Sequence, residues 1–503
     1  MKMKYHILLF VLLINTVIGF AQLSVFSKYL PFNQKADVYP VISNPDEGLL
    51  LIFLSGKEIR VNCLTDRFQS NKEIILKKPA KNSKNYLGSY IIDSSLIITF
   101  SDKRFTTVSQ LIVNMLTDST HEISMNLFSV GQKYLATWET SSNLIVLSIA
   151  ENSNTLIVSK FYEEGKTSQK EYNFTDVFSN GPLSKATLFS LFNENEGNLQ
   201  KIDNSMPVSL GIASAKNKVY LTNDEIIITI DMFEDFTYYL SLNMSDNSHQ
   251  SLVFPVTVME SENKNKAKNN SFIYDNTLFQ LGINKFELGL KVQSLTDTNK
   301  VAYLHSLTRK NIDFSNSSMI IRNEKEGFPY GNPVERNIKK TRKFKRILSG
   351  MHPAISVFRK QSDFQILIGG IIEIQQAKGV ISAAILVSGG EMVVGPGGNL
   401  VMPDPIYNFP SNYSFSSYPS RKIAYFSSLI NSTTFYNSRK PIAGYTYDYI
   451  FDYANYMPGR IGMVTIFKMK GDYYLGYYSY SSHTYNIEWF KNIDDHVVRY
   501  GNN

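Results

Sequence analysis

The stretch QLIVNMLTDSTHEISMNL, residues 110–127, joins an apolar run to an alternating run through four polar residues. The apolar run lies at 111–113, TDST follows at 117–120, and apolar and polar residues then alternate from His121 to Asn126. Aliphatic and β-branched runs bounded by Thr, Asp and Ser are typical of strands joined by a tight turn. The stretch therefore predicts a β-hairpin, and its recurrence along the chain decides the fold.

The hairpin pattern occurs six times. The first five starts are 52, 45, 82 and 49 residues apart, so the longest step fits one repeat with an insertion. A further apolar strand precedes several of the hairpins, at 96–100, 144–148, 226–230 and 463–467. Together these segments predict a recurring sheet of about four strands. The hairpins begin at Glu58, Gln110, Thr155, Thr237, Phe286 and Asp472.

A repeat of roughly 40 to 50 residues, each forming one antiparallel sheet, resembles a β-propeller. The resemblance implies an all-β fold, a β-propeller-like array of antiparallel four-stranded blades with one or two short helical insertions. No WD dipeptide, kelch double glycine or Asp-box accompanies the repeat, so no named propeller family is indicated. Tandem β-sandwich domains remain the alternative.

The first 21 residues, MKMKYHILLFVLLINTVIGFA, combine Lys2 and Lys4 with an apolar core and end in small residues at Gly19 and Ala21. This pattern predicts a signal peptide that is cleaved before Gln22. The leader ending and the abundance of Asn, Ile, Lys and Tyr resemble exported proteins of the Bacteroidota. The resemblance implies a periplasmic, cell-surface or extracellular location.

The mature chain contains a single cysteine, Cys63, so an internal disulfide is excluded and apolar burial must stabilise the fold. Removing the two leader lysines leaves 49 basic residues against 44 acidic ones, a balance too mild to indicate a nucleic-acid partner. The apolar segments after the leader are interrupted by charges, which predicts no transmembrane segment after cleavage. The sequence divides into a β-repeat region at 22–322, a basic insertion or linker at 323–350, and a Tyr-rich β-region at 351–503 that closes the same propeller.

The basic segment, NPVERNIKKTRKFKRILSG at 332–350, predicts a helix, with Asn332 as N-cap, Pro333 after it and Gly350 past its end. Seven cations fall within 336–346, and such density leaves like charges to repel unless solvent or an anion relieves them. The segment predicts either a patch for an acidic polysaccharide, lipid A phosphates or an acidic protein, or a solvated helix or connector. The candidate patch comprises Lys339, Lys340, Arg342, Lys343, Lys345 and Arg346.

Tyrosines are concentrated in YTYDYIFDYANY at 445–456 and DYYLGYYSYSS at 472–482. Side chains two residues apart on a strand share a face, and tyrosine combines a flat apolar ring with a polar tip. Such a face could hold sugar rings or a protein partner, or it could pack one blade against the next. The candidate binding residues are Tyr445, Tyr447, Tyr449, Tyr474, Tyr478 and Tyr480.

Local motifs for chemistry are weak. The glycine-rich stretch SGGEMVVGPGGNL at 388–400 lacks the Lys-Ser/Thr of a phosphate loop and predicts turns around a strand at 391–394. The histidines have no partner at metal-ligand spacing, and no GxSxG elbow is present, so the sequence indicates no metal, no cofactor and no hydrolase elbow.

These observations favour an exported, non-enzymatic binding or scaffold protein that uses a propeller-like surface to recognise a protein or a glycan at the cell envelope. The alternative is a carbohydrate-active enzyme, a glycosidase or lyase, with carboxylates gathered from different blades in the central channel. Sequence alone leaves enzymatic activity open, because residues from different blades show no common spacing.

Overall fold

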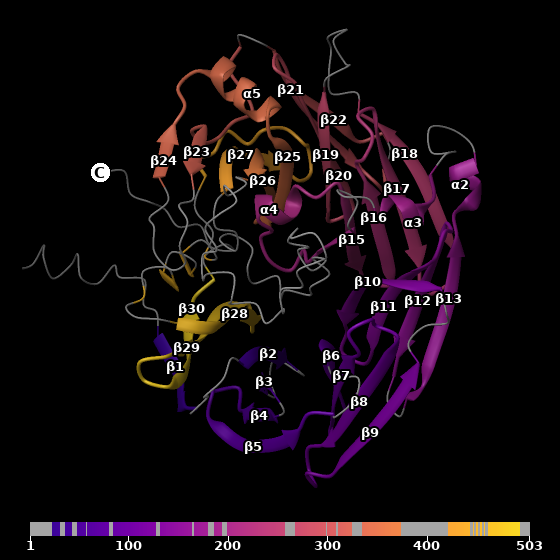
Figure 1. Ribbon diagram of the computed structural model, residues 1–503. Helices are drawn as coiled ribbons and strands as arrows, with labels where there is room; N and C mark the ends of the chain where they lie inside the picture. Colours follow the sequence, from indigo (N-terminus) through magenta and orange to yellow (C-terminus); the bar gives the residue numbers. More distant parts are fainter. Residues whose placement is uncertain are drawn as a thin grey trace, which may run out of the picture. The chain divides into compact units, whose positions relative to one another are not determined.

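The computed structural model divides the chain into two compact units: unit 1 comprises residues 1–77 and 444–503, and unit 2 comprises residues 78–443. Both units consist mainly of antiparallel sheets (Figure 1). The structure describes residues 23–30, 36–42, 48–56, 58–79, 84–126, 131–162, 165–179, 186–193, 199–256, 267–297, 299–307, 310–323, 334–373, 421–442, 446, 449–450, 453–454, 457 and 461–492.

Unit 2 begins with two four-stranded sheets, each a simple antiparallel meander in chain order. The hairpin at 110–127 forms the last two strands of the first sheet, as predicted. The first sheet contains β6 (Asn85–Ile92), β7 (Ser95–Ser101), β8 (Thr107–Asn114) and β9 (Thr120–Asn126), and the second contains β10 (Gln132–Glu139), β11 (Leu144–Ala150), β12 (Thr155–Phe161) and β13 (Thr167–Asn173).

The third and fourth sheets of unit 2 repeat this meander, and a short parallel strand, β14, precedes the third. The third contains β14 (Leu199–Ile202), β15 (Asn217–Thr222), β16 (Glu225–Ile230), β17 (Phe236–Asn243) and β18 (His249–Pro255), and the fourth contains β19 (Lys268–Tyr274), β20 (Thr277–Ile283), β21 (Leu288–Ser294) and β22 (Val301–Ser306).

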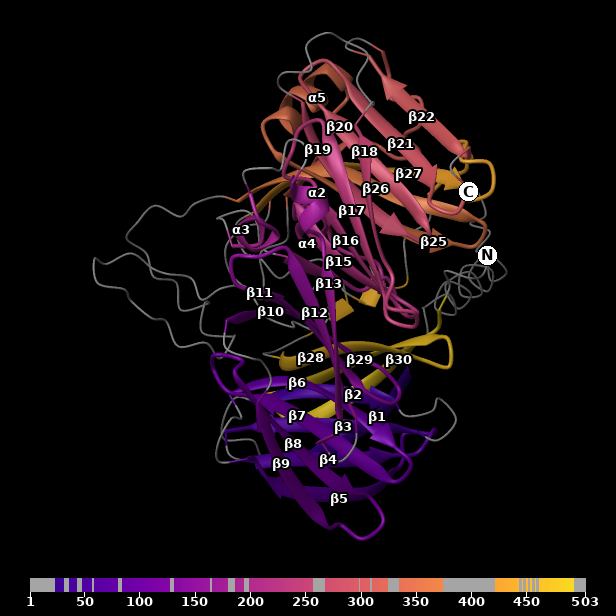
Figure 2. The ribbon, with the colours of Figure 1, turned by 90° about the vertical axis from the view of Figure 1, so that its right-hand side faces the viewer.

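The fifth sheet of unit 2 departs from the meander, because its strands follow the order β24-β23-β27-β26-β25. Figure 2 shows the five sheets of this unit following one another in chain order. Neighbouring sheets contact through their first strands, as between β6 and β10 or between β10 and β14. The strands are β23 (Ile320–Asn323), β24 (Val334–Asn337), β25 (His352–Lys360), β26 (Asp363–Glu373) and β27 (Arg421–Asn431).

Unit 1 holds two four-stranded sheets, and one of them joins the two ends of the described chain. Its strand β1 pairs with β30, with Leu23 opposite Trp489 and Tyr29 opposite Thr484. The joined sheet contains β1 (Leu23–Tyr29), β28 (Ile461–Met469), β29 (Asp472–Ser479) and β30 (Thr484–Phe490), and the other contains β2 (Ala36–Ile42), β3 (Leu49–Ser55), β4 (Glu58–Leu64) and β5 (Ser70–Lys77).

Local chemistry explains the hairpin that opened the sequence analysis. Asp118 turns the chain between β8 and β9 with a φ of 59°, a conformation that Asn and Asp tolerate better than most residues. The Asn114 Oδ1 atom accepts hydrogen bonds from the backbone N–H groups of Leu116 and Thr117, each at 3.0 Å. The polar residues between the two runs therefore satisfy the backbone of the turn.

Burial changes across each sheet in the way that stacked sheets require. All residues of β11 except the last are buried, whereas β13 at the edge of the same sheet alternates and is mostly exposed. Inner strands covered on both faces need apolar residues on both sides. The predicted fold class is confirmed: the protein is an all-β, propeller-like array of antiparallel sheets, and each of the six predicted hairpins closes one sheet's meander.

The structure corrects the basic segment. The predicted helix over 332–350 begins only at α5 (Thr341–Ser349), although it ends at Gly350 as predicted. Residues 334–337 instead form β24, because pairing with β23 satisfies the backbone on one side. The described residues 334–350 therefore contribute one strand and one helix to unit 2.

The other helices are short: α2 (Thr175–Ser179), α3 (Leu188–Leu191) and α4 (Leu210–Ala213). The sequence analysis predicted one or two short helical insertions of this kind. Among the described residues no helix has the length and hydrophobicity needed to cross a membrane. The glycine-rich stretch 388–400 lies outside the described residues.

Candidate functional site

Helix α5 docks on unit 2 through one apolar face. Phe344 and Leu348 are fully buried, and the Phe344 ring meets the Phe426 ring of β27 at a centroid distance of 5.8 Å. Ile338, just before the helix, is also buried. These three apolar side chains hold the segment on the sheet, although the helix begins later than predicted.

Lys345 does not lie on the surface where the sequence analysis placed it. Its side chain is buried, and its Nζ atom donates hydrogen bonds to the Ser306 carbonyl at 2.7 Å and to the Leu307 carbonyl at 2.6 Å. It also reaches the Ser306 Oγ atom at 2.9 Å. Burial lowers the pKa of Lys345 to about 8, although the Glu287 carboxylate opposes the shift. Lys345 therefore fastens α5 to the end of β22 and is not available to a partner.

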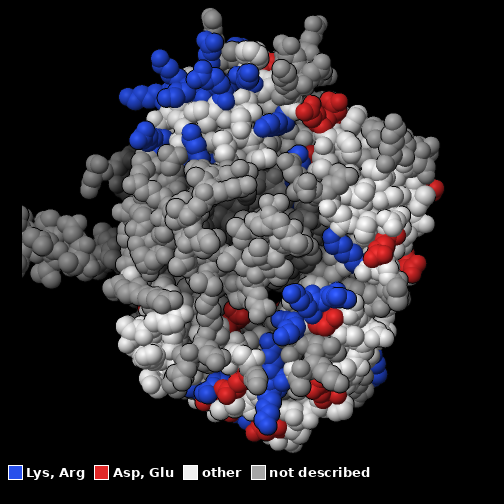
Figure 3. Space-filling model, in the orientation of Figure 1, with Lys and Arg blue, Asp and Glu red and all other residues white. Residues whose placement is uncertain are grey.

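The remaining cations form the basic surface. They are exposed and gather at the top of the view in Figure 3, where Figure 1 labels α5. Within the described part of the chain none of them forms an ion pair, so their charge is available to an external anion. The basic surface comprises Arg336, Lys339, Lys340, Arg342, Lys343 and Arg346, of which Arg336 was not among the candidate patch residues.

The first turn of α5 carries positive charge, although negative charge is favourable at the N-terminus of a helix. The first turn carries Arg342 and Lys343 and no acidic residue, and the N-cap residue Lys340 makes no side-chain capping hydrogen bond. The helix dipole places partial positive charge at this end, so cations here are unfavourable by about 0.3–1 kcal/mol each. An anion bound at this end would relieve the repulsion.

The Tyr-rich strand β29 is mainly part of the core of unit 1. Tyr474 is buried between Phe467, stacked at 5.3 Å, and Phe68 at 4.8 Å. Tyr478 is fully buried, and its hydroxyl donates to the Leu30 carbonyl at 2.9 Å. Two of the predicted binding tyrosines therefore pack inside the unit and present no ring to a ligand.

The other predicted tyrosines are less buried or not described. Tyr480 is half-buried and meets the Tyr478 ring edge-on at 5.2 Å, and Tyr449 is half-buried. Tyr445 and Tyr447 lie outside the described residues. The structure thus brings Tyr474, Tyr478 and Tyr480 together as packing partners along β29.

Two tyrosines that the sequence analysis did not select bind a buried carboxylate. Tyr453 and Tyr477 each donate a hydrogen bond of 2.9 Å to Glu488 of β30, one to each carboxylate oxygen. Burial and the neighbouring carboxylate raise the pKa of both tyrosines. Tyr477 lies on the face of β29 opposite to Tyr474 and Tyr478, so the two-residue period of the strand separates these roles.

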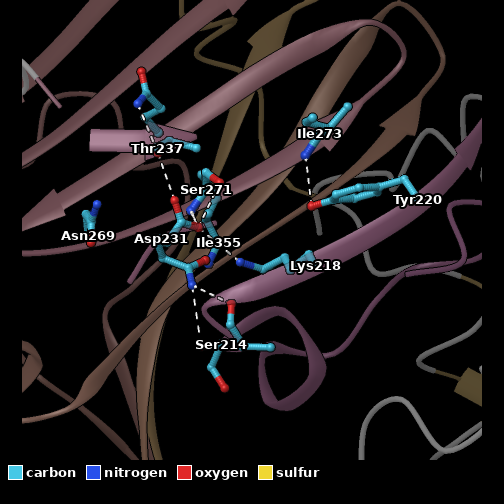
Figure 4. Close-up of polar contacts among 12 residues, drawn as sticks. Ser214, Lys218, Tyr220, Asp231, Thr237, Asn269, Ser271, Ile273 and Ile355 are labelled. Atoms are coloured by element: carbon cyan, nitrogen blue, oxygen red, sulfur yellow. Dashed lines mark hydrogen bonds and ion pairs between the residues drawn. The ribbon is translucent and has the colours of Figure 1, made fainter. Parts of the chain in front are cut away.

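Another buried polar cluster lies in unit 2, at the contact between its third and fourth sheets (Figure 4). Asp231 follows β16 and pairs with Lys218 of β15 at 3.3 Å, and both side chains have no solvent exposure. The carboxylate also accepts hydrogen bonds from Thr237 Oγ1 at 2.8 Å and from the backbone N–H of Ser271 at 2.7 Å. This cluster ties two sheets together and offers no open side to a ligand.

Comparisons with known proteins support no named family. No family model matches the chain, and no curated protein matches it. Among solved structures, the Dos1 propeller is similar at 9% identity and a TM-score of 0.30 over 93% of this chain and 83% of that one. The WD40 domain of SCAP from fission yeast matches at 11% identity and a TM-score of 0.28 over 69% of each chain.

A Synechocystis apocarotenoid oxygenase matches at 7% identity and a TM-score of 0.29 over 55% of this chain. The match spans 63% of the oxygenase. Similarities of this size carry no argument about activity. The fold assignment therefore rests on the strand pairing of this chain.

Proposed function

We propose that the protein is an exported binding or scaffold protein that recognises an acidic partner, a glycan or a protein, at the cell envelope through the basic surface at α5. The observation that carries the proposal is a set of six exposed cations within 336–346 that form no ion pair among the described residues. Positive surface potential attracts an anionic partner and speeds its encounter.

The anchoring of α5 supports the same proposal. A flexible basic connector would spread its charge over many conformations, whereas Phe344, Leu348 and Lys345 fix this helix on the sheet. Arg342, Lys343 and Arg346 are then held at helical spacing in one exposed region. Holding the cations in place lowers the entropy that binding must otherwise spend on ordering them.

The proposal is tested by the binding of the purified protein to immobilised polygalacturonate, lipopolysaccharide and an acidic protein. The triple variant Arg342→Ala/Lys343→Ala/Arg346→Ala should weaken binding by about tenfold to hundredfold, and raising salt from about 50 to 500 mM should do the same. The control variant Lys103→Ala/Arg104→Ala/Lys285→Ala removes three exposed cations elsewhere and should bind as the unaltered protein does. Equal losses in the two variants would contradict a localised site.

A further inference from the structure

A group of polar side chains from three sheets meets at the inner strands of unit 2, away from the basic surface. Its members are Tyr86 and Ser89 of β6, Glu139 at the end of β10, and Lys201 of β14. Strand β10 contacts both β6 and β14, which brings these residues together although their positions in the sequence are far apart.

Strand β6 is shaped to receive the Glu139 side chain. The Tyr86 hydroxyl donates to Glu139 Oε1 at 3.3 Å and also lies 2.7 Å from Ser89 Oγ, while the backbone N–H of Ser89 donates to the same carboxylate. Gly88 lies between them. A Cβ atom at this position would come within 2.6 Å of Glu139 Cγ, so a larger residue would require the Glu139 side chain to shift.

Lys201 is held beside this carboxylate by the second sheet. Its Nζ atom donates to the Thr137 carbonyl at 2.7 Å and lies 5.7 Å from the centre of the Trp138 ring. Among the described residues Glu139 and Lys201 form no direct ion pair, although their charges interact. The two side chains are thus near enough to interact electrostatically without bonding to each other within the described part of the chain.

The cluster has unused hydrogen-bonding capacity. The Glu139 side chain is exposed, and its carboxylate, with about four acceptor positions, uses two of them for partners among the described residues. The Lys201 ammonium has three donors, and one is used within the described residues. The cluster thus offers both acceptors and donors, and Glu139 is accessible to solvent.

The environment of Glu139 is unusual for an exposed carboxylate. The surrounding protein keeps water away from the carboxylate, and this desolvation raises the pKa of Glu139 to about 7. Lys201, Ser89 and Tyr86 act in the opposite direction. Burial also lowers the pKa of Lys201, against the charges of Asp203 and Glu139. Accessible groups with perturbed protonation mark functional sites more often than ordinary surface positions do.

We infer that this cluster is a second binding site, and that its ligand is an uncharged polyhydroxylated molecule such as a neutral oligosaccharide. The cluster holds both a carboxylate, Glu139, and an ammonium, Lys201, so neither a strong anion nor a strong cation is favoured. A hydroxyl group can donate to a carboxylate and accept from an ammonium at once, so the hydroxyls of a sugar can bind Glu139 and Lys201 together.

The test is isothermal titration calorimetry of the full protein with neutral oligosaccharides: cellotetraose, xylotetraose, maltotetraose and laminaritetraose. We expect at least one to bind. Glu139→Gln keeps the shape of the side chain but removes the charge, and Lys201→Met removes the donor, so each should weaken binding by about tenfold. Glu122→Gln, an exposed carboxylate on β9 of the same sheet as Tyr86, is the matched control and should have no effect.

Two results would overturn the inference: no binding of any of the four sugars at about 10 mM, which corresponds to less than about 3 kcal/mol of binding free energy, or unaltered binding by Glu139→Gln. Thermal unfolding verifies that each variant is folded. Because the sugars are uncharged, the triple variant of the basic surface should bind them normally, so failure of this inference is distinguishable from failure of the proposed function.

Discussion

Two of the carboxylate–lysine pairs of unit 2 are built differently. The side chains of Asp231 and Lys218 have no solvent exposure, and the Asp231 carboxylate accepts further hydrogen bonds from two sheets. Glu139 is exposed, interacts with Lys201 without a direct ion pair among the described residues, and keeps unused acceptors there. The difference indicates that the first pair stabilises the contact between sheets, whereas the second leaves polar groups available to a ligand.

The largest expected effect is at the buried pair. Asp231→Asn would leave the Lys218 ammonium without a counter-charge, and breaking a buried pair in this way costs about 3–5 kcal/mol. Urea unfolding of the unaltered protein and the variant measures the loss. Lys218→Met/Asp231→Asn buries no charge and should recover part of the stability. A double variant as unstable as Asp231→Asn alone would show that the ion pair is not what stabilises this contact.

A smaller loss of stability is expected at Lys345. This buried lysine differs from Lys218 because its partners are backbone carbonyls and not a carboxylate. Lys345→Met removes the donor from Ser306 and Leu307 and should lower the free energy of unfolding by about 1–3 kcal/mol. Arg346→Met, one residue further and exposed, is the control and should change it by less than about 0.5 kcal/mol.

The pH dependence of the free energy of unfolding, measured for the unaltered protein and for Lys345→Met, tests whether the buried ammonium has this role. The folded protein holds Lys345 with a pKa of about 8, below its ordinary value of 10.5. Between these values the unfolded chain binds more protons than the folded one, so this lysine makes the protein more stable as pH rises from about 8 to 10.5. Lys345→Met should lose that rise. An unchanged pH profile would mean that Lys345 is not buried as a charged group.

The sequence was sufficient for the hairpins because their information is local. Asn114 and Asp118 build the turn between β8 and β9 from side chains within a few residues. The start of α5 was mispredicted for the opposite reason. The local pattern of Asn332, Pro333 and Gly350 favoured a helix, but β24 pairs with β23, and β23 is held in turn by the distant strand β27.

Sites that depend on stacking were the least predictable. The two-residue period identified Tyr474 and Tyr478 as sharing a face, yet it could not show that the face is buried against Phe68 and Leu30 from the other end of the chain. Glu139 and Lys201 carry no common spacing, since three different sheets place them near Tyr86. Only the Gly88 position, beside a tyrosine on an inner strand, carried a local sign of close packing.

The smallest expected effect on stability is at Glu139, and it has the opposite sign to that at Asp231. With a pKa raised to about 7 from 4.5, the folded protein keeps a proton that the unfolded chain has lost, so Glu139 makes the protein less stable as pH rises from about 4.5 to 7. Glu139→Gln is neutral throughout. It should match the unaltered protein at pH 4.5 and exceed its stability at pH 8 by less than about 1 kcal/mol, because an exposed group is partly screened.

Urea unfolding at the two pH values, with Glu122→Gln as the control, measures this difference. A loss of stability in Glu139→Gln at pH 8 would place Glu139 with Asp231, as a carboxylate that ties sheets together. A gain at pH 8 that disappears at pH 4.5 would show that the ionised carboxylate costs stability where it stands. An ionised carboxylate that lowers stability is expected where a residue serves ligand binding and not folding.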